Sequence, residues 1–331
     1  MELQLGHERL RDGQEVELLL IRPPAGGWKD RIAPFLAHKG QPWTWQIEQH
    51  LEAPADQLES RFYVATCGQR LISHIMTAEF AGVGILGHVF TEPQWRGLGA
   101  ASILMRTVCE DFRRRDGIVM HLGTEYQSNA WRIYRRFGFE GICPPRGLMR
   151  LALQPRRYDQ LYAPGPTQVR PVCWQDWPML QALMLRPEGD WLRSRALRAF
   201  GIADVEQSFL ELMQQIAQGS ASAWVMVGPS GAAVGLLSLA ACCDLPAPAG
   251  QLDLYAHPDF ADQLGGLVGQ AALPDDWPLL CWLDGASGRR EAALVDAGLR
   301  VGCRLEGFCR SQRGLVDLVL LWRGRSVRGG P

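Results

Sequence analysis

Residues Gln94–Met105 read QWRGLGAASILM, a turn of small residues that leads into an apolar run at helical spacing. Before it stands GILGHVF (Gly84–Phe90), whose composition predicts a strand. The first N–H groups of a helix have no intrahelical partner and lie at the positive end of the helix dipole. Gly97 and Gly99 allow an anionic ligand to come close to that backbone. The stretch therefore predicts a strand–loop–helix unit that binds a phosphate group.

Three phosphate-binding motifs compete for this loop, and a tight packing turn is the alternative to all of them. A P-loop needs Gly-Lys followed by Ser or Thr, and the loop has no lysine. A dinucleotide fingerprint needs a third glycine where Ser102 stands, in a parallel βαβ unit that the preceding hairpin pattern disfavours. The coenzyme A loop R/Q-x-x-G-x-G/A fits in two registers, which start at Gln94 and at Arg96.

The bulk properties favour a two-domain globular protein. The chain has 331 residues, of which 47% are hydrophobic and 21% are charged, and its net charge is −1. A balanced charge predicts neither a nucleic-acid partner nor an anionic membrane surface. The start, MELQLGHERLRDG, lacks the pattern of a signal peptide, and apolar runs such as Gly235–Cys243 are too short to span a bilayer. We expect a cytoplasmic protein.

The nine cysteines are scattered along the chain. Cys242 and Cys243 are adjacent, and no cysteine or histidine cluster has the spacing of a zinc site. We interpret them as reduced thiols of the core and predict no metal site.

Periodicity and turn residues predict a regular order of elements in the first half. In chain order these are a strand at Gln14–Pro24, helices at Asp30–His38 and Trp43–Glu52, a hairpin over Ser60–Phe80 that turns at Cys67-Gly68-Gln69, a strand at Gly84–Phe90, a helix from Gly99 to Phe112, a strand at Gly117–Thr124 and a helix at Ser128–Phe139.

A similar order restarts after residues 154–167, QPRRYDQLYAPGPT, whose proline, glycine and charge predict a linker. The second set is a strand at Gln168–Val172, a helix at Trp174–Leu185, a hairpin over Ser222–Cys243 that turns at Gly228–Gly231, a strand at Gly250–Phe260, a helix at Ala261–Leu273, a strand at Pro278–Gly285, a helix at Ser287–Leu299 and a strand at Gly314–Arg323. The repeated order predicts an internal duplication, with domains at 1–153 and 168–331.

Two segments together resemble the GNAT (GCN5-related) N-acetyltransferase superfamily. HVFTEPQWRGLGAASIL (His88–Leu104) looks like the acetyl-CoA motif of that family, and NAWRIYRRFGFEG (Asn129–Gly141) looks like its next motif, A-x-x-x-Y-x-x-x-G-F. The resemblance is strong over residues 84–142 and weaker over 14–153. It implies an α/β (α+β) fold in which a mixed, largely antiparallel twisted sheet is flanked by helices. It also implies that acetyl-CoA is the cosubstrate and that its pyrophosphate binds the amides of the loop.

The resemblance implies direct attack of an amine on the acetyl thioester. The tyrosine of the second motif, which is the acid that protonates the departing thiolate, corresponds to Tyr134. The oxyanion donor is main chain near Phe90 or Thr91. The predicted cofactor contacts are Phe90, Thr91, Gln94, Trp95, Arg96, Gly97, Leu98, Gly99, Ala100, Ala101, Ser102, Gln127, Asn129, Tyr134 and Arg136. The arginines at 113–115 and 135–136 either reach the 3′-phosphate or form solvated helix faces.

The sequence does not decide which residue acts as the general base. His88 lies on the strand that lines the expected cleft, and an imidazole has an ordinary pKa near 6.5 that suits proton removal. Glu79, Glu92 and Glu125 are alternatives, with Glu92 expected to cap the loop and Glu125 to sit on the rim. A water chain without a dedicated base is equally compatible with the sequence. Trp28, Trp43 and Trp45 either line an acceptor pocket or pack in the core.

The second half looks like a degenerate copy of the first. When AHPDF (Ala256–Phe260) is aligned with TEPQW, residues Ala261–Leu264 stand where the first copy has Arg96–Gly99. An acidic, bulky loop at this position repels a phosphate. Aligning Gly298 with Gly138 puts Leu294 at the position of Tyr134. We therefore expect a non-catalytic domain, and an unrelated α/β domain is the alternative.

The leading hypothesis is an acetyl-CoA-dependent N-acetyltransferase that acts on a small-molecule or peptide amine. The alternatives are a non-catalytic acyl-CoA-binding or regulatory protein, and an acyltransferase that uses a longer acyl group or a hydroxyl acceptor. The tandem arrangement implies either a monomer that forms an intramolecular pseudo-dimer or a homodimer. The acceptor is not identified by the sequence.

Overall fold

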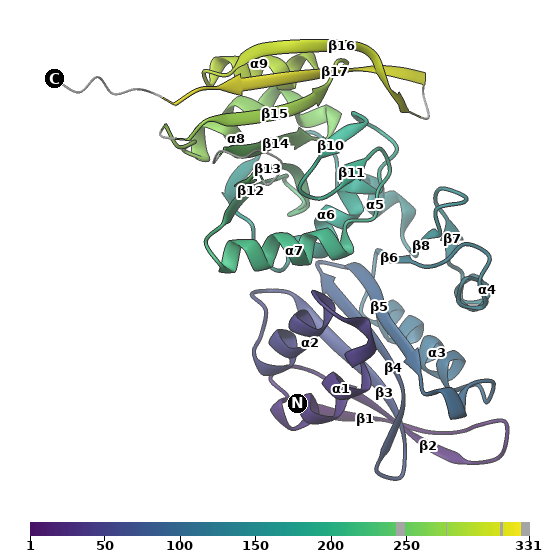
Figure 1. The fold of residues 1–331 in the computed structure, drawn as a ribbon. Coiled ribbons are helices and arrows are strands. Elements are labelled where there is room, and N and C mark those ends of the chain that lie inside the picture. Colours follow the sequence, from purple (N-terminus) through teal and green to yellow (C-terminus); the bar gives the residue numbers. More distant parts are fainter. Residues whose placement is uncertain (243–248, 276, 312–313, 326–331) are drawn as a thin grey trace. The chain divides into compact units, whose positions relative to one another are not determined.

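The chain folds into two compact units. The computed structural model describes residues 1–242, 249–275, 277–311 and 314–325 (Figure 1). Contacts group Met1–Tyr158 with Cys173–Met179 as the first unit, and Asp159–Val172 with Leu180–Pro331 as the second. Helix α5 (Pro155–Gln160) lies within the segment that the sequence predicts as a linker.

The first unit is built on one mixed sheet in the order β1-β2-β3-β4-β5-β6-β8-β7. Its strands are β1 (Glu2–Arg9), β2 (Glu15–Ile21), β3 (Glu59–Cys67), β4 (Arg70–Phe80), β5 (Val83–Thr91), β6 (Val119–Gly123), β7 (Glu140–Gly141) and β8 (Leu148–Ala152). Within this sheet β5 and β6 run parallel, whereas the other neighbours are antiparallel. The predicted fold class is confirmed.

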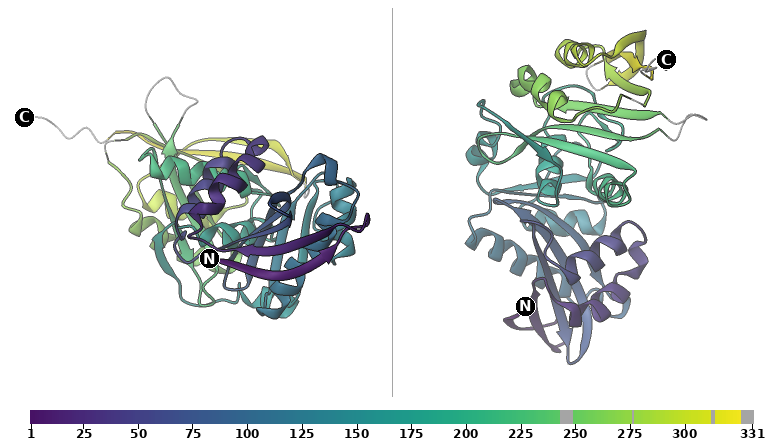
Figure 2. Two further views of the ribbon diagram at one scale, coloured as in Figure 1. Left: turned by 90° about the horizontal axis from the view of Figure 1, so that it is seen from below. Right: turned by 90° about the vertical axis from the view of Figure 1, so that its left-hand side faces the viewer.

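Helices cover both faces of this sheet, as Figure 1 and the right-hand view of Figure 2 show. They are α1 (Gly26–Phe35), η1 (Ala37–Lys39), α2 (Trp43–Glu52), η2 (Pro93–Trp95), α3 (Ala100–Arg114) and α4 (Asn129–Arg136). α1 and α2 lie on one face and α3 lies on the other. Side chains of a strand alternate between faces, so Tyr63 and Ala65 of β3 pack in the α3-side core with Leu104 and Val108.

A charged cluster ties α3 to the sheet. The Tyr63 hydroxyl donates to Asp111 Oδ2 at 2.6 Å, and Arg115 Nε donates to the same oxygen at 2.9 Å. Arg115 also holds the buried Glu79 carboxylate through Nη1 and Nη2 at 2.5 and 2.9 Å, and Thr77 Oγ1 donates to Glu79 at 2.5 Å. Glu79 is therefore half of a structural ion pair.

The sequence analysis missed β1 because its apolar alternation is limited to Leu3 and Leu5, on an edge strand that is otherwise polar and largely exposed. The cysteines of the described residues are free thiols, and Cys243 lies outside those residues. No helix in the described part of the chain combines the length and apolar character needed to cross a bilayer.

The second unit repeats the strand plan of the first. Its main sheet has the order β9-β12-β13-β14-β15-β17-β16, and β14 and β15 form its parallel pair. Without β1, the first sheet has the same succession, with its parallel pair in the same place. This shared topology supports the duplication inferred from the sequence.

The strands of this half are β9 (Gln168–Pro171), β10 (Leu192–Ser194), β11 (Ala199–Phe200), β12 (Ala221–Val227), β13 (Ala233–Ala241), β14 (Gly250–Ala256), β15 (Leu279–Asp284), β16 (Arg300–Ser311) and β17 (Gly314–Arg323). The helices are α6 (Asp176–Met184), α7 (Glu206–Ala217), η3 (Pro258–Gln263), α8 (Leu264–Gln270) and α9 (Gly288–Asp296). The sequence analysis did not identify β10, β11, α7 or β16.

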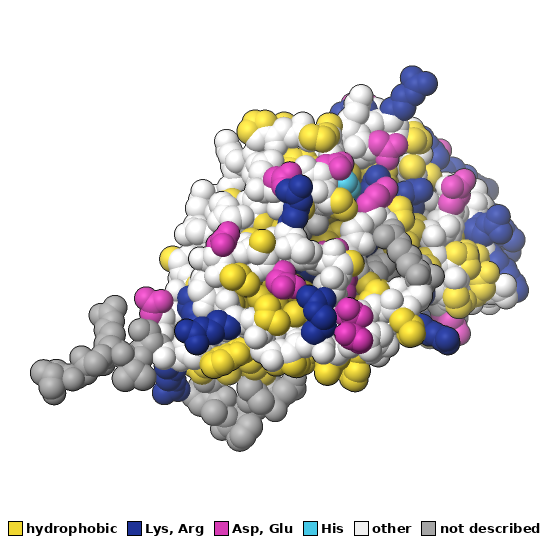
Figure 3. Space-filling view, turned by 90° about the horizontal axis from the view of Figure 1, so that it is seen from above, with side chains coloured by type: hydrophobic (Ala, Val, Ile, Leu, Met, Phe, Trp, Pro, Cys, Tyr) yellow, Lys and Arg dark blue, Asp and Glu magenta, His cyan; other side chains and the backbone are white. Residues whose placement is uncertain are grey.

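β16 and β17 leave several large apolar side chains exposed. Phe308 and Leu315 are 65% and 69% exposed. Seen from above, hydrophobic side chains on this face alternate with charged ones (Figure 3). The apolar strand that the sequence predicts at Gly314–Arg323, which is β17, is therefore only partly buried.

We predict that acidification destabilises the first unit. Burial lowers the pKa of His50 and His121 to about 3 and that of His74 to about 4, whereas an unfolded histidine titrates near 6.5. Below pH 6.5 the unfolded chain therefore binds protons that the native chain does not. Stability is fully present above pH 6.5 and falls by about 1.4 kcal/mol per pH unit for each residue as the pH drops toward these values.

Chemical denaturation at pH 7.0 and 5.5 measures this slope. His121→Leu is the matched variant, because neither ring nitrogen of the buried His121 has a hydrogen-bond partner among the described residues. This variant should reduce the dependence of the free energy of unfolding on pH by the contribution of one proton, about 1.4 kcal/mol per pH unit. An unchanged slope would show that His121 does not contribute.

We predict a structural role for Glu79. Glu79→Ala removes one of the two carboxylate partners of Arg115 and should lower the free energy of unfolding by about 3 kcal/mol. This value is near the lower end for a broken buried ion pair, because Arg115 keeps its ion pair with Asp111. The exposed Glu125 is the control, and Glu125→Ala should change stability by less than about 0.5 kcal/mol. Urea unfolding of both variants at pH 7 compares them, and equal losses would contradict the assignment.

Candidate functional site

The parallel pair β5–β6 opens toward its carboxyl end. β5 pairs with β6 only through Val83–Ile85 against Val119–His121. Within the fully described residues 1–158, the remaining residues of β5 do not pair with those of β6. α3 follows β5 and α4 follows β6, so both helix N-termini lie at the open end. Ligands of α/β folds bind at the carboxyl ends of parallel strands where the strands diverge.

The loop before α3 presents its backbone at this opening. Gly97 and Gly99 have φ of 80° and 99°, values that favour glycine, and Gly99 is the N-cap of α3. No side chain of the described residues caps this helix, so the N–H groups of Ala100, Ala101 and Ser102 point outward. A Cβ added at Gly97 would meet no atom within 4 Å. The loop thus has the open, amide-lined surface that a phosphate requires.

Arg11 holds the loop in place, and the sequence analysis did not find it. From the β1–β2 turn, Arg11 Nη1 donates to the Gly97 carbonyl at 3.1 Å, and its backbone N–H donates to the Leu98 carbonyl at 3.0 Å. No local pattern marks Arg11, since its partners lie more than 80 residues away in the sequence.

The remaining loop residues predicted to bind the cofactor have distinct positions. Arg96 donates from Nε to the Thr91 carbonyl at 3.0 Å and lies over the ring of Phe90, so it supports the end of β5. The side chains of Trp95 and Leu98 pack against the α3-side core. These two residues are therefore able to contact a ligand chiefly through main chain.

Glu92 is the N-cap residue of η2 at the start of the loop, but its side chain makes no capping hydrogen bond. Its carboxylate accepts from Arg70 at 3.0 and 2.5 Å and from Gln94 Nε2 at 3.2 Å. The hydrogen bonds from Arg70 hold the pKa of Glu92 below its usual value. An ion-paired carboxylate is a poor proton acceptor, which argues against Glu92 as the base.

α4 brings the second motif to the same opening. Ser128 caps it by accepting from the Trp131 N–H at 3.1 Å, while Gln127, Asn129 and Arg136 are exposed. Tyr134 is only 6% exposed and belongs to the α3-side core cluster, where its ring centroid lies 6.0 Å from that of Phe139. Tyr134 therefore lies in the α3-side core, whereas Gln127, Asn129 and Arg136 are exposed at the two ends of α4.

A β-bulge in β5 positions His88. His74 and Met76 of β4 pair with Phe90 and Gly87, so β5 contains one extra residue between these pairs. His88 has φ of 51°, a left-handed conformation that is uncommon for a residue other than glycine. It is 7% exposed and directed to the α2 side of the sheet, where Gln46 Oε1 lies 2.9 Å from its Nε2.

His88 is neutral near pH 7. Burial lowers its pKa well below 6.5, and the nearby His74 and Lys39 lower it further. His74 Nδ1 lies 2.9 Å from the His88 carbonyl, and the edge of Trp43 contacts the ring at a centroid distance of 5.3 Å. The lowered pKa keeps a lone pair free on the imidazole near pH 7, and it makes the ring a weaker base than an ordinary histidine.

Aromatic side chains surround the end of β5 on the α1–α2 side. The Phe90 ring lies 5.0 Å from Phe35 and 4.1 Å from His38, centroid to centroid. Of the three tryptophans considered for an acceptor pocket, Trp43 is the one that contacts His88. Trp28 is buried and donates to Glu2 at 2.7 Å, and Trp45 packs against Trp174, so both are packing residues.

The second unit lacks these features at the corresponding place. Its β14 leads into η3, whose start is capped by His257, and then directly into α8, so no glycine turn precedes the helix. Leu294, which the alignment puts at the position of Tyr134, is fully buried.

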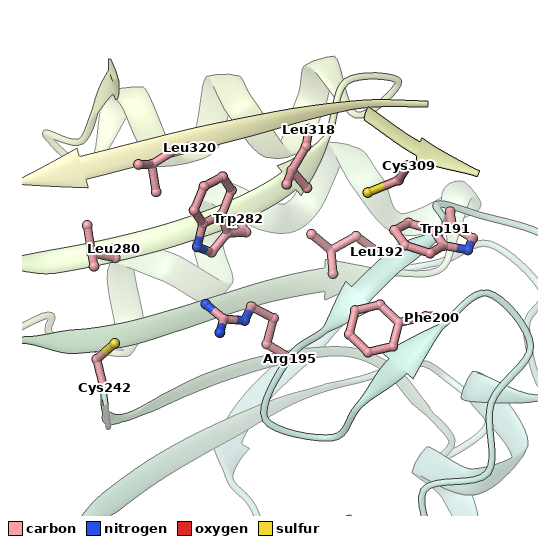
Figure 4. Close-up of a pocket in the computed structure, with 10 residues that line it drawn as sticks. All are labelled: Trp191, Leu192, Arg195, Phe200, Cys242, Leu280, Trp282, Cys309, Leu318 and Leu320. Carbon is pink, nitrogen blue, oxygen red and sulfur yellow. The ribbon is translucent and has the colours of Figure 1, made fainter. Parts of the chain in front are cut away.

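An apolar pocket of 550 Å³ lies on the sheet of this second unit (Figure 4). Trp191, Phe200 and Trp282 point into it, and its lining contains neither a carboxylate nor a histidine. Proton-transfer chemistry is therefore better served by the first unit. The described residues contain no group of three or more metal-ligating side chains.

Comparisons with known proteins bear on the first unit. Residues 28–139 match the family model described as Acetyltransferase (GNAT) family. A search of curated proteins finds no match.

Solved structures similar to the chain include three acetyltransferases. An N-acetyltransferase from Staphylococcus aureus Mu50 is 11% identical, with a TM-score of 0.38, over 48% of this chain and 98% of that one. A GNAT superfamily phosphinothricin acetyltransferase from Sinorhizobium meliloti, solved in complex with AcCoA, is 14% identical, with a TM-score of 0.39, over 50% and 92%. A GNAT family acetyltransferase from Streptococcus pneumoniae is 14% identical, with a TM-score of 0.38, over 48% and 98%.

The family match covers the strand with the bulge, the glycine loop, α3 and the helix that carries Tyr134. Residues 28–139 of this chain thus form a domain of the GNAT family of acetyltransferases.

Proposed function

We propose that the first unit is an acetyl-CoA-dependent N-acetyltransferase that acts on a primary amine. The observation that carries the proposal is the open end of the β5–β6 pair, where α3 starts without a side-chain cap behind an open glycine turn. Acetyl-CoA supplies an acyl group activated as a thioester. The loop amides of residues 97–102 hold its pyrophosphate, because they combine unsatisfied N–H groups with the positive end of α3.

In this proposal the chain's own residues move two protons. His88 accepts the proton of the attacking ammonium, because only the neutral amine is a nucleophile. Main-chain N–H groups at Phe90 or Thr91 stabilise the oxyanion that develops. Tyr134 donates a proton to the departing thiolate, for which a phenol with an ordinary pKa of about 10 is suited.

The competing function is acyl-CoA binding without catalysis. The burial of Tyr134 in the α3-side core favours it, since a packed ring needs no chemical role. The neutral, buried His88 at the bulge favours the enzyme, because cofactor binding alone does not require a histidine in a left-handed conformation.

We predict that Ala101→Glu abolishes acetyl-CoA binding and leaves the fold intact. A carboxylate at the second residue of α3 complements the helix dipole but repels the pyrophosphate. In the parent, acetyl-CoA at about 100 times its dissociation constant should add about 2.7 kcal/mol of stability. Thermal unfolding with and without acetyl-CoA measures the difference.

The matched control is Gly265→Glu, which puts the same charge at the second residue of α8, where a Cβ meets no atom within 4 Å. This variant should keep the full acetyl-CoA shift. If acetyl-CoA does not raise the thermal stability of the parent, the loop is only a packing turn and the proposed function is wrong.

We predict that Tyr134→Phe lowers kcat by at least about tenfold with little change in acetyl-CoA affinity. Phenylalanine keeps the packing of the ring against Phe139, so the fold is preserved. Tyr126→Phe is the control, because Tyr126 packs against Trp131 at the start of the same helix. Steady-state kinetics with a panel of amines compares the two, and equal activity of both variants would favour a structural Tyr134.

A further inference from the structure

A buried chain of polar groups extends from His88 into the core on the α2 side. Gln46 of α2 is fully buried, and its Oε1 lies 2.9 Å from His88 Nε2. On its other side, Gln46 Nε2 lies 2.7 Å from His50 Nδ1, and Ser60 Oγ lies 2.8 Å from the same nitrogen. Of the residues in this buried row of polar groups, His88 alone has a place in the proposed chemistry.

The nitrogen of the Gln46 amide also lies against the sulfur of Met76. Met76 Sδ lies 3.7 Å from Gln46 Nε2, and a thioether is able only to accept a hydrogen bond. The NH₂ group of Gln46 therefore faces Met76 and His50, and its carbonyl oxygen faces His88. Because that oxygen is an acceptor only, the hydrogen between Gln46 and His88 has to be on His88 Nε2.

We propose that Gln46 is a positioning residue that holds His88 as the Nε2–H tautomer, so that Nδ1 is its basic atom. A neutral imidazole carries one hydrogen, and the hydrogen bond at one nitrogen decides which nitrogen keeps the lone pair. Nδ1 of His88 makes no hydrogen bond to any described residue. The inference rests on the proposed function for its catalytic consequence, and the tautomer itself is independent of it.

The surroundings of His88 make this hydrogen bond important. The charged and titratable groups that act on its ring are His74 on β4, His50 on α2, and His38 and Lys39 on η1, and all of them disfavour the imidazolium. The Gln46 carbonyl is the hydrogen-bond acceptor that the described residues offer to the ring. It keeps accepting from Nε2 after Nδ1 has gained a proton, and so it stabilises the protonated product of base catalysis.

The backbone of His88 is held independently of the ring. His74 Nδ1 lies within hydrogen-bond distance of the His88 carbonyl, and the bulge places residue 88 toward α2. Trp43 covers one edge of the ring. Loss of the Gln46 carbonyl should therefore alter the protonation pattern of the ring without releasing the strand.

The direct test is ¹⁵N NMR of the full chain with ¹⁵N-labelled histidine side chains, in which His88→Gln assigns the His88 signals. At pH 7.5 we expect the Nε2–H tautomer in the parent protein and a mixture of tautomers in Gln46→Met. An Nδ1–H tautomer in the parent, or an unchanged spectrum in Gln46→Met, would overturn the proposal. Neither result depends on whether the protein acetylates an amine.

Kinetics test the consequence. Gln46→Met should lower kcat by about tenfold, a part of the 10²–10⁴ that a general base contributes, and leave the KM for acetyl-CoA unchanged. Gln46→Glu puts a carboxylate against Nε2, so the pKa of His88 rises, and the acidic limb of kcat/KM should move up by about one pH unit. Gln49→Met and Gln49→Glu, on the exposed side of α2, are the controls and should match the parent.

If the parent shows acetyl-CoA binding and turnover but neither Gln46 variant changes the pH profile or kcat, the positioning role is wrong while the proposed function stands. If no amine is acetylated, the NMR result alone decides the tautomer. Gln46→Glu retains a hydrogen-bonding side chain of the same length, so it keeps the test available should Gln46→Met fail to fold.

Discussion

The site depends on the short length over which the parallel strands β5 and β6 are paired. β5 and β6 share only the stretch from Val83 to Ile85, and beyond it each strand leads away to its own helix. A parallel pair that remained joined would leave no room at its carboxyl end, and the N-termini of α3 and α4 would abut the sheet. The separation creates an opening whose walls are main chain on one side and side chains on the other. The glycine loop before α3 and the capped start of α4 both lie at that end of the strands.

Two energetic compromises accompany this arrangement. A non-glycine residue in a left-handed conformation at a bulge costs free energy, and so does the burial of imidazoles that are kept neutral. Hydrogen bonds to His74 and Gln46 offset part of this cost at His88. The α3 side of the sheet is stabilised in another way, by the Glu79–Arg115–Asp111–Tyr63 cluster. On the α3 side the carboxylates of Glu79 and Asp111 stabilise the packing of the helix. On the α2 side the buried polar groups around His88 are uncharged.

The second unit shows which features the fold itself does not require. It has the same strand order and a parallel pair in the same position, yet its β14 passes into η3 and α8 without a glycine turn. The lining of its apolar pocket contains neither a carboxylate nor a histidine. The frame of the fold therefore persists on hydrophobic alternation alone. The glycine loop and the bulge at His88 are thus features of the first unit that the shared frame does not require, which is why we propose different roles for the two units.

The sequence by itself determined the elements whose signal is local. The apolar period of α3, the hairpin turn after Cys67 and the small residues from Gly97 to Ala101 each follow from neighbours along the chain, and the family motif rests on the same residues. Polar edge strands such as β1 gave no such signal. Only the tertiary structure decided the partners of the titratable groups. Glu79 is ion-paired by a residue 36 positions away, Arg11 holds a loop 86 positions away, and Gln46 meets His88 across 42 positions. Hydrogen-bond geometry and burial, which set the protonation state of His88, exist only once the helices have packed on the sheet.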